Sequence, residues 1–266
     1  MNEDTHTVVR EHYAKVSTGN VGCAPGCCAP MSSEQSLLIG YSAEELAALP
    51  EGADMGLGCG NPQAIASLRA GETVLDLGSG GGFDCFLAAR AVGPTGKVIG
   101  VDMTPQMITL SRGNARKTNA TNVEFRLGEI EHLPVADGTI DAILSNCVIN
   151  LSPDKSAVFG EAFRVLRVGG RLAISDVVAI APIPDDVRAD VGAVCGCIGG
   201  AAPLEDVKRM LAAAGFKSIS VKVAPNSAAV VESWMAGASK FIASATIEAR
   251  RGSEKAEACC PPGCCP

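Results

Sequence analysis

The sequence predicts an α/β fold, with one mixed sheet of seven strands and helices on both faces. From Thr73 onward, short apolar strand patterns alternate with amphipathic helix patterns, as in parallel sheets with right-handed crossovers. A turn with glycines at alternate positions follows the first of these strands, a place where open α/β sheets bind ligands. Phe241–Ile247 alternates like a last, antiparallel strand, which makes the sheet mixed.

The segment before Thr73 is predicted to be mainly helical. Residues 1–20 carry apolar side chains at helical spacing. Ser42 and Glu45 form a capping box, and the helix they start ends before Pro50. The other expected features are an irregular Cys/Pro/Gly stretch, a glycine-rich loop around a cysteine and a short helix, at 21–30, 56–62 and Gln63–Leu68.

The central segment supplies five strands. They are expected at Thr73–Leu77, Lys97–Val101, Val123–Leu127, Ile140–Ser145 and Arg171–Val177. A helix should follow the first strand at about Phe83–Val92. Thr104 and Ser152, each followed by a proline at the first helical position, are predicted to cap two later helices. Gly169-Gly170 is predicted to end the second of these helices.

The last part of the chain departs from this alternation. Residues 185–202 are expected to form a helix or loop, followed by a helix at Pro203–Ala214 and a strand at Phe216–Val223. Val230–Ala236 carries the single tryptophan. From about Arg251 the chain is polar and then Cys/Pro-rich, and we expect it to be disordered.

The composition excludes several classes of partner. The chain has 266 residues, a net charge of −7 and no basic cluster, which argues against nucleic acid and anionic membranes. Met1–Arg10 has no apolar run typical of a signal peptide. Val191–Leu204, an uncharged run, is too short to span a bilayer. The sequence therefore predicts a cytoplasmic protein.

Cysteine is unusually abundant, with 12 residues. A reducing compartment disfavours a disulfide framework and favours metal, metalloid or redox chemistry. The body of the chain contains Cys59, Cys85, Cys147, Cys195 and Cys197. Two terminal clusters contain Cys23, Cys27, Cys28, Cys259, Cys260, Cys264 and Cys265. The spacing within these clusters is loosely compatible with zinc and fits trivalent arsenic at least as well.

The glycine turn carries the first functional signal. Its pattern, Asp-x-Gly-x-Gly-x-Gly, offers backbone that a ligand can approach closely and a helix N-terminus with free N–H groups. The pattern resembles motif I of class I S-adenosylmethionine-dependent methyltransferases, which have a Rossmann-like fold. The resemblance implies that the turn holds the amino-acid end of the cofactor. A generic glycine-rich turn is the alternative. The predicted cofactor residues here are Asp76, Gly78, Ser79, Gly80 and Gly82.

The ends of later strands supply further cofactor candidates. Asp102, beside Met103, ends the second strand, where a carboxylate can accept two ribose hydroxyl hydrogen bonds. It could instead, or in addition, favour the dipole of the helix that follows. The loop after the third strand, with Glu129 and Ile130, is predicted to meet the adenine. Asn146 follows the fourth strand, beside the first strand at the switch point.

Three cysteine motifs are more specific than the glycine turn. They are Ser145–Lys155 around Cys147, Gly56–Pro62 around Cys59, and Cys197–Ala201. All three resemble motifs of the arsenite S-adenosylmethionine methyltransferases. Three further stretches also fit that family, Val9–Lys15, Gly128–Glu131 and Glu161–Leu166. The resemblance covers roughly residues 8–250.

This resemblance implies a mechanism. Cys147 and Cys197 would hold arsenic(III), and Cys59 would join them or cycle as a redox partner with an N-terminal thiol, Cys28 or Cys27. Soft thiolates suit a soft centre. The arsenic lone pair would attack the sulfonium methyl in line, and a disulfide formed on the enzyme would be reopened by thioredoxin or glutathione. We expect a monomer acting on a small molecule.

The resemblance also implies how the chain is divided. We expect an N-terminal helical and Cys-rich segment, a Rossmann-like cofactor-binding core, a region that completes the sheet and the arsenic site, and a Cys-rich tail, at 1–62, 63–182, 183–250 and 251–266.

Other readings of the thiols remain open at this point. A cysteine often packs as a small hydrophobe, and this reading is favoured for Cys85. Cys195 could be a spare ligand. The chain could also methylate another small molecule such as a quinone, which would not need Cys147 or Cys197. A non-catalytic thiolate metal or metalloid binder would not need the glycine turn.

Overall fold

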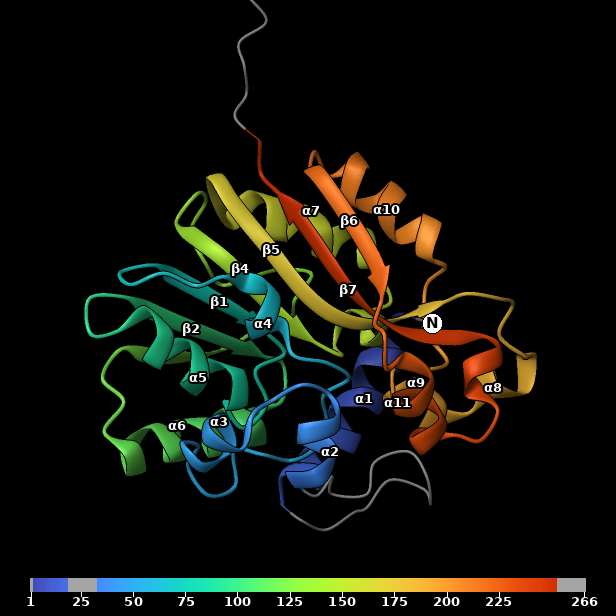
Figure 1. Cartoon of the computed structure of the whole chain (residues 1–266), viewed down its shortest axis with the longest axis horizontal. Coiled ribbons are helices and arrows are strands. Elements are labelled where there is room, and N and C mark those ends of the chain that lie inside the picture. Colours follow the sequence, from blue (N-terminus) through green and yellow to red (C-terminus); the bar gives the residue numbers. More distant parts are fainter. Residues whose placement is uncertain (1, 19–32, 253–266) are drawn as a thin grey trace, which may run out of the picture.

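The computed structural model describes residues 2–18 and 33–252, and this part contains one seven-stranded sheet in the order β3-β2-β1-β4-β5-β7-β6 (Figure 1). The strands are β1 (Thr73–Leu77), β2 (Lys97–Asp102), β3 (Val123–Leu127), β4 (Ile140–Asn146), β5 (Leu166–Ala179), β6 (Lys217–Val223) and β7 (Ile242–Arg250). Strands β1 to β5 pair in parallel, whereas β7 pairs antiparallel with both β5 and β6. The predicted mixed sheet is confirmed.

Helices cover both faces of this sheet. On one face lie α4 (Pro62–Ala66), α5 (Phe83–Val92) and α6 (Pro105–Thr118), and on the other α7 (Lys155–Val165) and α10 (Leu204–Ala213). Helix α11 (Ser227–Trp234) packs against β7. Figure 1 shows the remaining helices gathered near one end of the sheet: α1 (Asn2–Ser17), α2 (Ser33–Leu38), α3 (Ala43–Ala47), α8 (Asp185–Ala189) and α9 (Val191–Cys195).

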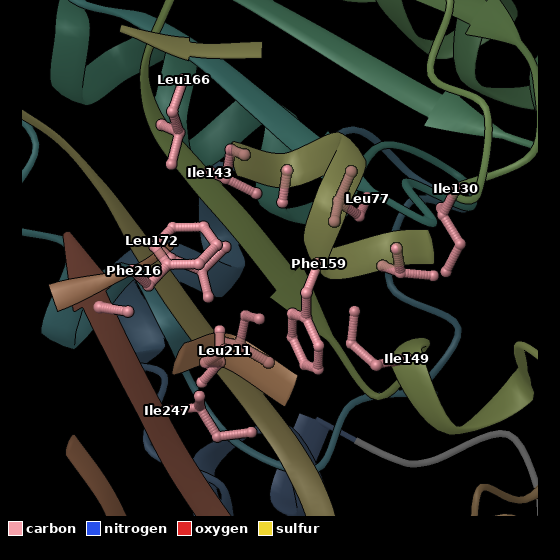
Figure 2. Packing of buried hydrophobic residues seen from close by; sticks show 14 of the residues in the cluster. Leu77, Ile130, Ile143, Ile149, Phe159, Leu166, Leu172, Leu211, Phe216 and Ile247 are labelled. Carbon is pink, nitrogen blue, oxygen red and sulfur yellow. The ribbon is translucent and has the colours of Figure 1, made fainter. Parts of the chain in front are cut away.

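The core follows the two-residue period of the strands. In β1, Val74 faces the cluster that contains Phe86 of α5, whereas Leu75 and Leu77 face the cluster that contains Phe159 of α7. Figure 2 shows this second cluster from close by. A third cluster lies at the carboxyl end of the sheet and contains four of the body cysteines, Cys59, Cys147, Cys195 and Cys197.

Two predicted features around α7 are wrong. Asp154 caps the helix by accepting a hydrogen bond from Ala157 N at 2.9 Å, so Ser152 is left to donate to Glu131 instead. Gly169-Gly170 does not end the helix, because β5 already begins at Leu166. The shift in register between Ile140 and Ala142 of β4 accommodates this early start of β5.

Of the other predicted helix caps, one is confirmed in full and one only in its position. The Ser42–Glu45 capping box is present in α3. Pro105 lies at the start of α6, although the Thr104 side chain makes no capping bond. The side chain of Asp102 accepts from Thr104 N instead. Among the described residues, no helix is long and apolar enough to cross a membrane.

Candidate active site

Two adjoining cavities lie at the carboxyl ends of β1, β2 and β4. The Asp102 cavity, of about 670 Å³, is also lined by Met103, Ile130 and Glu131. The Asp84 cavity, of about 550 Å³, is also lined by Asp76, Ser79 and Tyr41. Both are lined by Leu57, Gly78, Gly80 and Asn146. The two cavities therefore form one elongated site along the glycine turn.

The glycine turn is fixed by backbone hydrogen bonds to β2. Gly78 N and Ser79 N donate to Val101 O at 2.8 and 3.0 Å. Gly82 has φ 96°, and a Cβ at this position would lie 2.7 Å from the Phe86 ring. The Ser79 hydroxyl is buried and has no hydrogen-bond partner among the described residues, and Ser79 lines the Asp84 cavity. The turn therefore offers an unused polar group to a ligand.

Asp102 lies where the sequence predicts it. Its Oδ2 accepts from Gly80 N at 2.9 Å and its Oδ1 from Thr104 N at 2.8 Å. Burial raises the pKa of this carboxyl, although both N–H donors lower it. Each oxygen keeps a second acceptor site, so the carboxylate can still bind two hydroxyls.

A buried polar network borders the Asp84 cavity, and the sequence prediction missed it. Tyr41 OH donates to Asp84 Oδ1 at 2.8 Å, and Gln63 Nε2 donates to Asp84 O at 2.7 Å. Burial raises the Asp84 pKa to about 6 despite these hydrogen bonds. Asp76 also has a raised pKa, first from burial and then from Asp84, and accepts from the Cys85 thiol at 3.2 Å. Asp84 itself was the available sequence signal, because it is an acid between the apolar residues Phe83 and Cys85.

The predicted adenine loop is only partly at the cavity. Ile130 and Glu131 line the Asp102 cavity, whereas Glu129 is not among its lining residues. Instead Glu129 pairs with Arg10 of α1 at 3.0 Å. Glu131 accepts from His6 at 3.0 Å, so α1 is tied to this loop and forms one wall of the cavity.

The thiols of Cys59 and Cys147 meet beside the Asp102 cavity, and the Cys197 thiol bonds to the backbone of Cys147. The Sγ atoms of Cys59 and Cys147 and a carboxylate oxygen of Asp176 lie within 4.8 Å of one another. The Cys197 thiol donates to Cys147 O at 2.7 Å. The thiols are buried, with residue exposures of 1%, 8% and 1% for Cys59, Cys147 and Cys197. Cys147 also lines the Asp102 cavity, which connects the thiols to that cavity.

The environment keeps these thiols protonated. Burial raises the pKa of Cys59. The Cys147 thiol and then burial raise the pKa of Cys197 well above its ordinary value. The Cys147 pKa is also well above its ordinary value, because the Cys59 thiol and burial outweigh the lowering effect of its hydrogen bond with Cys197. The site therefore presents neutral thiols.

Two of the three cysteines have left-handed backbone. Cys147 has φ 55° and Cys197 has φ 63°. Such a conformation costs energy for a residue with a side chain, and it persists where the surrounding structure holds it. Cys147 N donates to Ser175 O at 2.9 Å, which is part of that support.

Asp176 is a second residue that the sequence prediction missed. It interrupts the apolar end of β5 and accepts from Ile149 N at 2.9 Å, Asn150 Nδ2 at 2.8 Å and Val177 N at 2.7 Å. Burial raises its pKa to about 6. An acid inside a buried strand was the sequence signal.

The other cysteines have different positions. Cys85 is buried in α5 on one face of the sheet, as the packing interpretation predicts. Cys195 is buried in α9, and its carbonyl accepts from Tyr13 OH at 3.0 Å. The N-terminal candidates Cys23, Cys27 and Cys28, and the four cysteines from Cys259 to Cys265, lie outside the described residues.

Comparisons with known proteins agree with this geometry. A methyltransferase domain family matches residues 68–215. The arsenite methyltransferase of Halobacterium salinarum is 50% identical over 262 residues, covering 94% of this chain and 67% of that protein. The arsenite methyltransferase of Aquipseudomonas alcaligenes is 38% identical, covering 79% of this chain and 62% of that protein. The chain thus spans about two thirds of the length of these relatives.

A solved structure shows the same similarity. The crystal structure of an arsenic(III) S-adenosylmethionine methyltransferase from Chlamydomonas reinhardtii matches with a TM-score of 0.59 and 32% identity. The match covers 84% of this chain and 74% of that one.

Proposed function

The chain belongs to the arsenite methyltransferase family, and from this premise we propose that it transfers methyl groups from S-adenosylmethionine to trivalent arsenic held by Cys59, Cys147 and Cys197. The observation that carries the proposal is that the buried thiols of Cys59 and Cys147 meet, that the Cys197 thiol bonds to Cys147 O, and that Cys147 lines the Asp102 cavity. A methyl acceptor held there would lie next to a cofactor bound along the glycine turn. This proximity is the main requirement for an in-line transfer.

The cofactor site fits S-adenosylmethionine. The Asp102 carboxylate has acceptor sites for the ribose hydroxyls, and Met103 and Ile130 offer apolar surface to the adenine. The Ser79 hydroxyl and the turn around Gly80 offer polar groups to the amino-acid end. When bound, this cofactor supplies an electrophilic methyl group on a sulfonium.

Neutral thiols suit a neutral arsenic substrate. Arsenous acid carries three hydroxyl groups, and each thiol that replaces one forms an As–S bond and releases water. No net charge is therefore buried when Cys59, Cys147 and Cys197 bind it. Three-coordinate arsenic keeps its lone pair as the nucleophile, so no side chain has to remove a proton from it. The burial of the thiols keeps bulk water away from the arsenic.

Each methyl transfer formally oxidises the arsenic by two electrons. Two thiols can return these electrons by forming a disulfide, and an external dithiol or glutathione can reopen it. We assign this role to Cys59 with Cys28 or Cys27, and the reductant to thioredoxin or glutathione. A monomer and a cytoplasmic location stay predictions from the sequence.

A direct assay tests the proposal. The full chain is incubated with labelled S-adenosylmethionine, arsenite and excess thiol, and the arsenic species are separated by chromatography. Labelled methylated arsenicals that depend on enzyme and arsenite are the expected result. Label that appears only in a quinone or in another non-arsenical acceptor would contradict it.

A further inference from the structure

Side chains from two strands hold the backbone of Cys59. Its N–H donates to Asn146 Oδ1 of β4 at 3.0 Å, and its carbonyl accepts from Ser244 Oγ of β7 at 2.7 Å. Both polar backbone groups of Cys59 are thus paired with side chains rather than with a strand or helix. The Cys59 thiol itself donates to Ser175 O of β5 at 3.3 Å, so its position depends on these two side chains together with that bond.

The Asn146 carboxamide is engaged mainly by the protein itself. While Oδ1 accepts from Cys59, Nδ2 donates to Gly60 O at 2.8 Å and to Tyr41 OH at 3.0 Å, with a longer contact to Asp84 Oδ2 at 3.3 Å. An amide nitrogen has only two hydrogens, so both are already used. Asn146 was predicted from the sequence to bind the cofactor directly, and these contacts favour a different role.

The loop that carries Cys59 is packed tightly on this side chain. A Cβ at Gly58 would lie 2.8 Å from Asn146 Nδ2. On the other side, a Cβ at Gly60 would lie 2.9 Å from the Ser175 side chain. The loop therefore lies closely against side chains of two strands, so we expect a movement of the carboxamide to displace the loop.

Asn146 also reaches the cofactor site. It lines both the Asp102 cavity and the Asp84 cavity. Its partner Tyr41 lines the Asp84 cavity and donates to Asp84 Oδ1 at 2.8 Å. A continuous chain of hydrogen bonds thus runs from the wall of the Asp84 cavity through Asn146 to the backbone of Cys59.

We propose that Asn146 is a positioning residue that couples occupancy of the Asp84 cavity to the position of the Cys59 thiol. The inference rests on the proposed function only for the identity of the ligand in the Asp84 cavity. That ligand is the amino-acid end of S-adenosylmethionine or of its product. A polar occupant that bonds to Tyr41 or Asp84 changes the partners available to Nδ2. Because the carboxamide is planar, Oδ1 and the Cys59 N–H move with it. By linkage, arsenic bound at Cys59 changes cofactor affinity by the same factor.

Thiol footprinting tests the coupling without arsenic. The full chain is alkylated with N-ethylmaleimide, with and without S-adenosylhomocysteine, and the rate at each cysteine is read by fragment mass spectrometry. A buried thiol reacts only when its segment opens, so the rate at Cys59 reports opening of its loop. We expect the ligand to slow Cys59 by at least about fivefold more than it slows Cys85. The Cys85 thiol donates to Asp76 of the Asp84 cavity, so its rate reports the general protection that the ligand gives to that cavity.

Two variants separate the two supports of Cys59. Asn146→Ala and Ser244→Ala each remove one partner of its backbone, so both should speed its alkylation without ligand. Only Asn146→Ala should lose the ligand effect, because the Ser244 hydroxyl bonds to Cys59 without lining either cavity. Tyr41→Phe keeps Asn146 but removes the hydroxyl bonded to it, and it should weaken the ligand effect on Cys59. If Asn146→Ala does not fold, Tyr41→Phe is the variant that tests the coupling.

Three outcomes would overturn the coupling. The first is a ligand effect in Asn146→Ala that is as large as in the parent chain. The second is complete loss of the ligand effect in Ser244→Ala. The third is the absence of a ligand effect in the parent chain. A separate failure to methylate arsenite would overturn the proposed function and leave this result standing, since no arsenical is present in the footprinting.

Discussion

The cofactor cavities and the thiol site are built from the chain in different ways. The glycine turn from Asp76 to Gly82 is one local segment, and Asp102 is bonded directly to it. The thiols come from a loop before α4, the end of β4 and the turn after α9, at positions at least 50 residues apart. A cofactor site can therefore be recognised from a short motif, whereas the thiol site exists only in the folded chain.

This comparison predicts that the cofactor site and the thiol site can be disabled separately. Cys147→Ser or Cys197→Ser should reduce arsenite methylation by at least about a hundredfold, the loss that a misplacement of about 1 Å at a reacting centre can cause. Serine oxygen is hard and stays protonated, so it binds arsenic poorly. Cofactor affinity, measured by calorimetry, should stay near that of the parent.

Cys85→Ser is the matched control for these variants. It also replaces a buried thiol, but its hydroxyl can still donate to Asp76, as the thiol does now. We expect arsenite methylation to be largely retained. An equal loss in Cys85→Ser would mean that any buried serine harms the enzyme, and the distinction between the cofactor site and the thiol site would fail.

Asp102→Ala is the converse variant, because it disrupts the cofactor site and leaves the thiols unchanged. Asp102→Ala should weaken S-adenosylmethionine binding by at least about tenfold, since even one charge-assisted hydrogen bond contributes about 1.5 kcal/mol. Binding of a trivalent arsenical to the thiols should persist. Glu129→Gln is the comparison, because Glu129 pairs with Arg10 outside the cavity lining, and it should change affinity less. Unchanged affinity for S-adenosylmethionine in a folded Asp102→Ala variant would contradict the assignment of Asp102 to the ribose hydroxyls.

A third experiment sharpens the roles within the thiol site. Cys59→Ser should slow methylation of arsenite more than that of a monomethylated arsenical. The monomethylated substrate already has one position filled by carbon and needs fewer thiols. Single-turnover rates on the two substrates measure the difference. Equal losses on both would count against a separate role for Cys59.

The smallest expected effect is on stability. Burial raises the pKa of Asp84 and Asp176 from 3.8 to about 6, so the folded state binds protons that the unfolded state has already released. The cofactor-free chain should therefore lose about 1 kcal/mol per group between pH 5 and pH 7.5. Urea unfolding at both pH values measures this change. Asp84→Asn should flatten the dependence, and an unchanged slope would contradict the assignment.

The parallel half of the fold was predictable because its signals are local. Strand β1 matches its predicted range, and β2 and β4 differ by one residue at their ends. The start of β5 was wrong because Gly169-Gly170 looks like a helix stop, and only the pairing of Leu166 with Ile140 shows that it belongs to a strand.

The candidate site likewise has a part that is predictable from local signals and a part that is not. The turn and Asp102 could be predicted from spacing alone. The contact of Tyr41 with Asp84 joins residues 43 apart, and that of Asn150 with Asp176 joins residues 26 apart. No local pattern encodes such pairs, because packing of different elements creates them. The meeting of Cys59 with Cys147 was expected from family resemblance and not from spacing.

The place of β7 in the sheet has a consequence for how the protein is made. This strand lies between β5 and β6, although both precede it in the chain. The bond from Ser244 to Cys59 joins residues 185 apart, which a ribosome making about 5–20 residues per second separates by roughly 10–40 s. Cys59 waits through this whole interval, and Cys147 through about its second half, for the strand that completes their surroundings. The nascent chain therefore passes through a period in which these thiols are more accessible to arsenite and oxidants than in the finished fold, where both are buried.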